Sequence, residues 1–101
     1  MSDAKVTVVA KLKAKPGLED EVKKHLSALV APTRTEEGCI NYDLHQAKDD
    51  PSQFLFHENW VSREALDRHL AKPYLQNLMA RADELFAEPI NVMFWTEISE
   101  K

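Results

Sequence analysis

A carboxylate within an aromatic strand is the feature of this sequence that most constrains its fold. The run Phe54–Trp60 has the composition of a strand, in which successive side chains point to opposite faces. The side chains that share one face are Phe54, Phe56, Glu58 and Trp60. A carboxylate buried there without a partner would be strongly destabilising, or its pKa would rise until it bound a proton. We therefore expect Glu58 to have a specific environment in the folded chain.

The helix expected after this strand carries a histidine on its apolar side. Ser62 is a suitable N-cap, because its hydroxyl can accept a hydrogen bond from a backbone N–H of the first turn. Leu66, His69 and Leu70 follow at helical spacing, and Pro73 ends the segment. The acid on the strand and the imidazole on the helix should thus both point toward apolar surroundings.

The order of elements along the chain predicts an α+β fold. The expected elements are a strand over Lys5–Ala14, a helix from about Leu18 to Thr35 that Pro32 ends or kinks, strands over Cys39–Gln46 and Phe54–Trp60, helical segments over Ser62–Ala71 and Tyr74–Phe86, and a strand over Ile90–Ile98. This β-α-β-β-α-β order is the split βαβ, or ferredoxin-like, arrangement. We expect one domain over residues 1–101, with a four-stranded antiparallel sheet and helices on one face. Alternation in the second strand predicts that Ile40 and Tyr42 share a face.

The face of the sheet without helices is expected to carry much apolar surface. Either Val9, Met93 and Trp95 or the residues that alternate with them would lie on it. Large exposed apolar patches are rare on soluble monomers and mark interaction sites. Packing two such faces together would cover them, so we expect a homodimer.

Composition excludes several classes of partner. A chain of 101 residues can bury one modest core. Its net charge of −4 and scattered Lys and Arg argue against nucleic-acid binding. There is no membrane-length apolar run and no signal-peptide pattern at the start. The single cysteine, Cys39, cannot form an internal disulfide. We expect a cytoplasmic protein without a nucleic-acid or membrane partner.

Three side chains are candidate catalytic residues: His69, Glu58 and Trp60. Imidazole titrates near neutrality, so His69 could act as a general base or acid, or could be a core-edge histidine bonded to a carbonyl. Glu58 could orient that imidazole, take up a proton itself if burial raises its pKa, or form a salt bridge. Trp60 could form a flat wall for an aromatic ring, or pack in the core.

Further side chains could line a pocket beside these residues. The candidates are Tyr42, Phe56, Leu66, Tyr74 and Met79. Metal binding is not indicated, because the adjacent His57 and Glu58 point to opposite faces and no His-x-His or His-x-x-x-His pair occurs. We predict no metal and no cofactor.

Several motifs resemble those of the antibiotic biosynthesis monooxygenase (ABM) family. They extend over nearly the whole chain and are Val6–Ala10, Lys15-Pro16-Gly17, Pro32-Thr33-Arg34, Glu37-Gly38-Cys39, Tyr42–Gln46, and Glu58-Asn59-Trp60 followed by Ser62, Ala65-Leu66, His69-Leu70 and Pro73. The resemblance implies a small dimeric α+β barrel built from ferredoxin-like subunits. It also implies oxidation of quinols or anthrones by dioxygen without metal or flavin.

Departures from the family pattern narrow the expected function. Of the positions that surround the substrate in the anthrone-oxidising branch, only Trp60 carries over; the others hold Phe56, Leu66 and Ala80. The haem-degrading branch needs an asparagine where this chain has Ala10. The chain is more similar to the small quinol-monooxygenase-like members, which share the Glu-x-Trp and His-Leu pattern.

We therefore expect a cofactor-independent monooxygenase that oxidises a quinol or similar electron-rich phenol with dioxygen. Two alternatives are compatible with the same residues. One is an isomerase that acts on a small oxygenated metabolite. The other is a non-catalytic dimeric protein that binds small molecules or serves in a stress response, in which His69 and Glu58 are structural.

Overall fold

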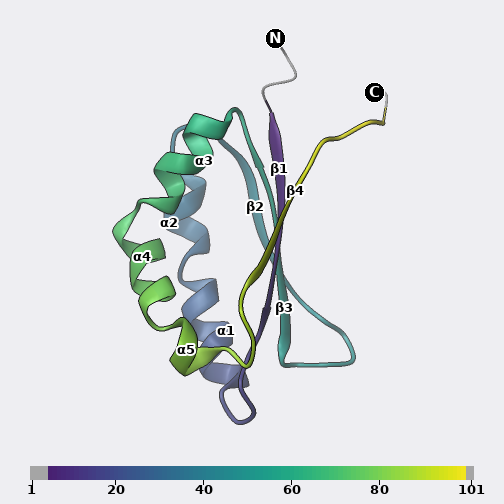
Figure 1. Ribbon diagram of the computed structural model, residues 1–101, viewed down its shortest axis with the longest axis vertical. Helices are drawn as coiled ribbons and strands as arrows, with labels where there is room; N and C mark the ends of the chain where they lie inside the picture. The colour runs from purple at the N-terminus through teal and green to yellow at the C-terminus, as the bar shows by residue number, and fades with distance from the viewer. Residues whose placement is uncertain (1–4, 100–101) are drawn as a thin grey trace.

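The computed structural model describes residues 5–99 and consists of a sheet covered on one side by helices (Figure 1). The elements in order are β1 (Val6–Lys13), α1 (Glu19–Ser27), α2 (Val30–Arg34), β2 (Cys39–Gln46), β3 (Gln53–Trp60), α3 (Arg63–Leu70), α4 (Pro73–Ala80), α5 (Ala82–Leu85) and β4 (Asn91–Trp95). The strands lie in the order β2-β3-β1-β4, and every neighbouring pair is antiparallel. The predicted ferredoxin-like fold is confirmed.

Each of the two helical regions is divided into shorter helices. Breaks were predicted at Pro32 and at Pro73, but the positions and number of the breaks differ. The first region breaks at Ala28 and Leu29, so that Pro32 falls in the first turn of α2. A proline is tolerated there because a first-turn N–H has no partner within the helix. Pro73 is the first residue of α4, and a further break at Arg81 separates α5. Among residues 5–99, no helix has the length and apolar character needed to cross a bilayer.

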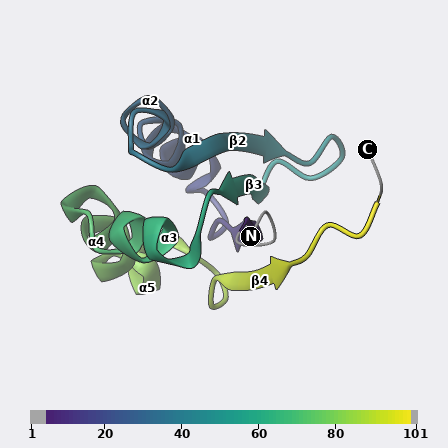
Figure 2. The same cartoon turned by 90° about the horizontal axis from the view of Figure 1, so that it is seen from above.

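The core lies between the sheet and the helices. Val8, Ala10 and Leu12 of β1 and the alternate residues of β3 point into it and are buried. Figure 2 shows α1 and α2 nearer to β2, and α3, α4 and α5 nearer to β4. The helix layer therefore has two parts. The part formed by α3, α4 and α5 lies over the inward-pointing side chain of Glu58.

The second strand departs from simple alternation. A β-bulge between Cys39 and Asn41 interrupts its pairing with β3, because a bulge places two residues opposite one. Ile40 is consequently 53% exposed, whereas Cys39 pairs with Trp60 and packs against the core. The prediction that Ile40 shares the inner face with Tyr42 is wrong. The last strand is also shorter than expected, since β4 covers only Asn91–Trp95.

On the open face of the sheet, the part toward β4 is apolar and the part toward β2 is polar. Val9 pairs with Met93 and Thr7 with Trp95, and these two β4 side chains are 50% and 49% exposed. Toward β2, Thr7 Oγ1 donates to Asn59 Oδ1 at 2.5 Å, and Asn59 Nδ2 donates to Asn41 Oδ1 at 2.8 Å. The predicted apolar residues thus occupy the open face, with a hydrogen-bonded polar group beside them.

We predict that this face mediates homodimer formation. Sedimentation at micromolar concentration should give twice the 11.6 kDa chain mass. Trp95→Glu should shift the protein toward monomer, because it places a charge in the apolar half of the face. Val61→Glu is the matched control, since Val61 is 50% exposed but lies in the turn before α3. A stable monomer of the unaltered chain would contradict the prediction.

Candidate active site

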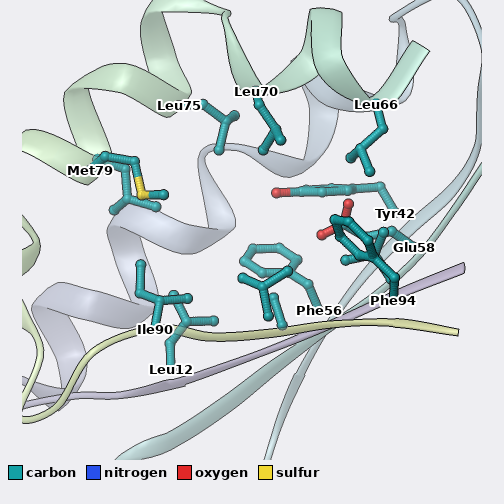
Figure 3. Close-up of a pocket in the computed structure, with 14 residues that line it drawn as sticks. Leu12, Tyr42, Phe56, Glu58, Leu66, Leu70, Leu75, Met79, Ile90 and Phe94 are labelled. Atoms are coloured by element: carbon teal, nitrogen blue, oxygen red, sulfur yellow. The ribbon is translucent and has the colours of Figure 1, made fainter. Parts of the chain in front are cut away.

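A cavity of about 260 Å³ lies between the inner face of the sheet and helices α3 and α4 (Figure 3). Aliphatic and aromatic side chains form nearly all of its lining. Within residues 5–99, Glu58 is the only carboxylate that lines the cavity, and Tyr42 contributes a phenol hydroxyl. An apolar pocket with a few polar groups is the usual form of a small-molecule site.

The strand geometry of β3 directs Glu58 toward this cavity. The residue is 5% exposed, and its Oε1 accepts a hydrogen bond from Trp60 Nε1 at 2.9 Å. Burial raises the pKa of the carboxyl to about 7; the Trp60 hydrogen bond opposes the rise and the negative charge of Glu36 adds to it. Glu58 can therefore both release and accept a proton near neutral pH, as a general base requires.

Tyr42 faces Glu58 from the neighbouring strand. The two residues are paired in the register of β2 and β3, and the Tyr42 ring stacks on Phe56 with 4.6 Å between centroids. Burial and the charge of Glu58 raise the pKa of Tyr42 above its usual range. The residue thus keeps its proton, and its hydroxyl points into the cavity as a hydrogen-bond donor (Figure 3).

His69 lies behind the cavity wall and does not line it. The residue is 1% exposed, and its ring packs against the ring of Trp60 with 4.6 Å between centroids. Burial lowers its pKa, although the hydrogen bond to Glu36 and the charge of Glu36 oppose this. The imidazole is therefore mainly neutral at pH 7. To act as the predicted base it would have to contact the substrate, and a residue behind the cavity wall does not.

The carboxylate beside His69 is Glu36, which the sequence analysis did not single out. His69 Nδ1 lies 3.0 Å from Glu36 Oε2, and the Tyr74 hydroxyl donates to the same oxygen. The turn that carries Glu36 approaches α3 closely at Gly38, where φ is +90° and an added Cβ would lie 2.5 Å from Ala65 Cβ. The idea that Glu58 orients the imidazole is wrong, since Glu36 makes that contact.

The predicted pocket residues separate into two groups. Tyr42, Phe56, Leu66 and Met79 line the cavity together with Glu58, whereas Trp60 and Tyr74 do not. Sequence reasoning missed much of the aliphatic lining, although the apolar spacing of Leu75 and Leu78 in α4 gave a signal for it. Among residues 5–99, no group of three or more His, Cys, Asp or Glu side chains is placed to hold a metal ion.

Comparison with known proteins identifies the family. The model of the family "Antibiotic biosynthesis monooxygenase" matches residues 5–81. The chain belongs to this family. It is 35% identical to the Mycobacterium tuberculosis protein named "Putative monooxygenase Rv0793" over 95 residues, which cover 94% of this chain and 93% of that protein.

Two further similarities extend the comparison. The crystal structure of PA3566 from Pseudomonas aeruginosa has a TM-score of 0.91 at 29% identity, with 98% of this chain and 99% of that chain covered. An uncharacterized protein of Synechocystis is 30% identical over 93% of this chain, which spans only 64% of that longer protein. Family membership and the printed name of the Mycobacterium tuberculosis relative support a general monooxygenase-type function.

We predict that Glu58→Gln stabilises the protein at alkaline pH. Burial raises the pKa of Glu58 from its usual 4.5 to about 7 in the folded chain, so well below pH 4.5 the carboxyl is neutral in both states and the shift does not affect stability. As the pH rises from there to about 7, the free energy of unfolding falls progressively. Glutamine removes the charge and keeps an acceptor for Trp60. Urea unfolding should show the variant more stable than the parent by up to about 3 kcal/mol at pH 8, with no gain at pH 4. An equal difference at both pH values would contradict the raised pKa.

We also predict that Glu36 is a major structural contact. Glu36→Ala should lower the free energy of unfolding by about 1–3 kcal/mol, because it leaves the buried His69 Nδ1 without its acceptor. Glu37→Ala is the matched control: Glu37 is adjacent but exposed, so its loss should change stability by less than about 0.5 kcal/mol. Chemical denaturation of both variants measures the difference, and equal effects would refute the assignment.

Proposed function

We propose that the protein is a cofactor-independent monooxygenase that oxidises a quinol or similar electron-rich phenol with dioxygen. The observation that carries the proposal is a buried carboxyl, Glu58, facing an apolar cavity with a pKa raised to about 7. Membership of the ABM family supports the same class of reaction.

Glu58 acts as the base in the first step. A phenol has a pKa near 10, so transfer of its proton to Glu58 is uphill by about three pKa units, or roughly 4 kcal/mol. That is small beside the barrier of roughly 16 kcal/mol that a turnover of about ten per second implies. The Tyr42 hydroxyl is placed to donate a hydrogen bond to the developing phenolate and so to stabilise it.

The quinol anion then reduces dioxygen. One oxygen atom is inserted into a ring C–H bond and the other leaves as water, while the ring ends as a hydroxyquinone. The quinol supplies all four electrons, two from its conversion to a quinone and two from the C–H oxidation. The apolar lining keeps water from the charged intermediates.

Trp60 is assigned a positioning role in this scheme. Its indole N–H holds Glu58 Oε1, and His69 packs on the ring of Trp60. Within the described chain, no second hydrogen bond to the Glu58 carboxylate is present, so the remaining oxygen is available to a ligand. The scarcity of polar groups in the cavity lining favours an aromatic substrate over the small oxygenated metabolite of the isomerase alternative.

Oxygen uptake with a panel of hydroquinones tests the proposal. We expect kcat/KM to rise with pH through one ionisation near pH 7, and Glu58→Gln to lower kcat by about a hundredfold or more. Label from ¹⁸O₂ should appear in the hydroxyquinone at one atom per turnover.

Glu37→Gln, an exposed neighbouring change, is the control and should keep full activity. Full activity in Glu58→Gln together with loss in a folded His69→Ala variant would return the role of base to His69. No oxygen uptake with any hydroquinone would favour the non-catalytic binding alternative.

A further inference from the structure

We infer that the substrate is an alkyl-substituted phenol or quinol, whose ring lies at the Glu58 end of the cavity and whose alkyl chain extends toward Met79 and Ile90. This inference rests on the proposed function for the ring chemistry. Its basis is that polar and aromatic groups are unevenly distributed along the cavity. The register of the sheet shows which residues lie at each end.

The floor of the cavity changes character along the strands. Val8 of β1 pairs with Glu58 on one side and with Phe94 on the other. Two residues further along β1, Ala10 pairs with Phe56 and Val92. After two more residues the floor is Leu12. The floor therefore passes from carboxylate and aromatic side chains to purely aliphatic ones.

The helix side of the cavity, formed by α3 and α4, shows the same change from polar and aromatic to aliphatic surroundings. Leu66 of α3 lies beside Tyr42 and Glu58, whereas Met79 of α4 lies at the opposite end near Ile90 and Leu12 (Figure 3). Among the lining residues of the far end, no polar side chain occurs. A polar substituent would find no hydrogen-bond partner there, and its desolvation would oppose binding.

The size of the cavity exceeds that of a single ring. From Val8 to Leu12 the strand advances by about 13 Å, roughly twice the length of a phenol. A cavity of about 150 Å³ with a similar lining holds benzene, and this one has about 260 Å³. At roughly 30 Å³ per methylene, comparable to a water molecule, the remaining space fits a chain of about three or four carbons.

Binding of 4-alkylphenols, measured by calorimetry without turnover, tests the inference. Each added methylene should lower Kd by about fourfold, the value expected when apolar surface is removed from water. The gain should stop after about four carbons, where the chain reaches the half-exposed Met79, and the stoichiometry should be one ligand per chain.

Met79→Asp distinguishes the cavity from general apolar adsorption. The substitution places a charge at the far end, so it should abolish the gain with chain length. Val61→Asp is the matched control, because Val61 is similarly exposed and does not line the cavity. It should leave the whole series unchanged.

The outcomes separate this inference from the proposed function. A Kd that is independent of chain length, or a gain that survives Met79→Asp, would overturn the inference even if quinols are oxidised. A gain that Met79→Asp abolishes would support the inference, even if no quinol causes oxygen uptake and the proposed monooxygenase activity fails.

Discussion

The hydrogen bond from the Trp60 indole to Glu58 is the interaction on which the site depends. The alternation of β3 forces both side chains into the core, where a carboxylate needs compensation. One hydrogen bond at 2.9 Å supplies only part of it, since two or three would be needed to hold the pKa low. The ionised carboxylate is therefore incompletely stabilised, and the pKa of Glu58 is raised to about 7. The same burial that makes Glu58 unfavourable for stability thus makes it suitable for proton transfer.

A second polar cluster supports this arrangement from behind. Glu36 binds His69 and Tyr74, and so links the turn before β2 to α3 and α4. His69 in turn packs on the indole that holds Glu58. The two carboxylates have different roles: Glu36 Oε2 contacts both His69 and Tyr74, whereas Glu58 keeps one oxygen toward the cavity. A helix histidine beside an inner-face glutamate suggested a single catalytic pair, but the fold gives each a different partner.

Periodicity was sufficient for the fold and for the inner face of the site. The two-residue period of β3 and the helical spacing of α3 correctly place Phe56, Glu58 and Leu66 together. What the pattern could not supply were features set by single positions or distant contacts. The bulge that exposes Ile40 adds one residue to the strand, and the residue types of the strand do not indicate it. The Glu36–His69 contact joins residues that are 33 apart in the sequence. The aliphatic end of the cavity arises where α4 lies over β1; the apolar spacing of Leu75 and Leu78 indicates which side of α4 is buried, but not which strand that side faces.

The position of Trp60 gives the protein an internal optical reporter. Indole emission responds to the electric field at the ring, and Trp60 donates its N–H to the group whose charge changes near pH 7. The other tryptophan, Trp95, is 49% exposed on the edge strand of the single chain and adds a second indole signal that does not come from the site. A chain with phenylalanine in place of Trp95 would therefore carry one tryptophan, whose emission records the charge of Glu58 and the arrival of an aromatic ligand without any added label.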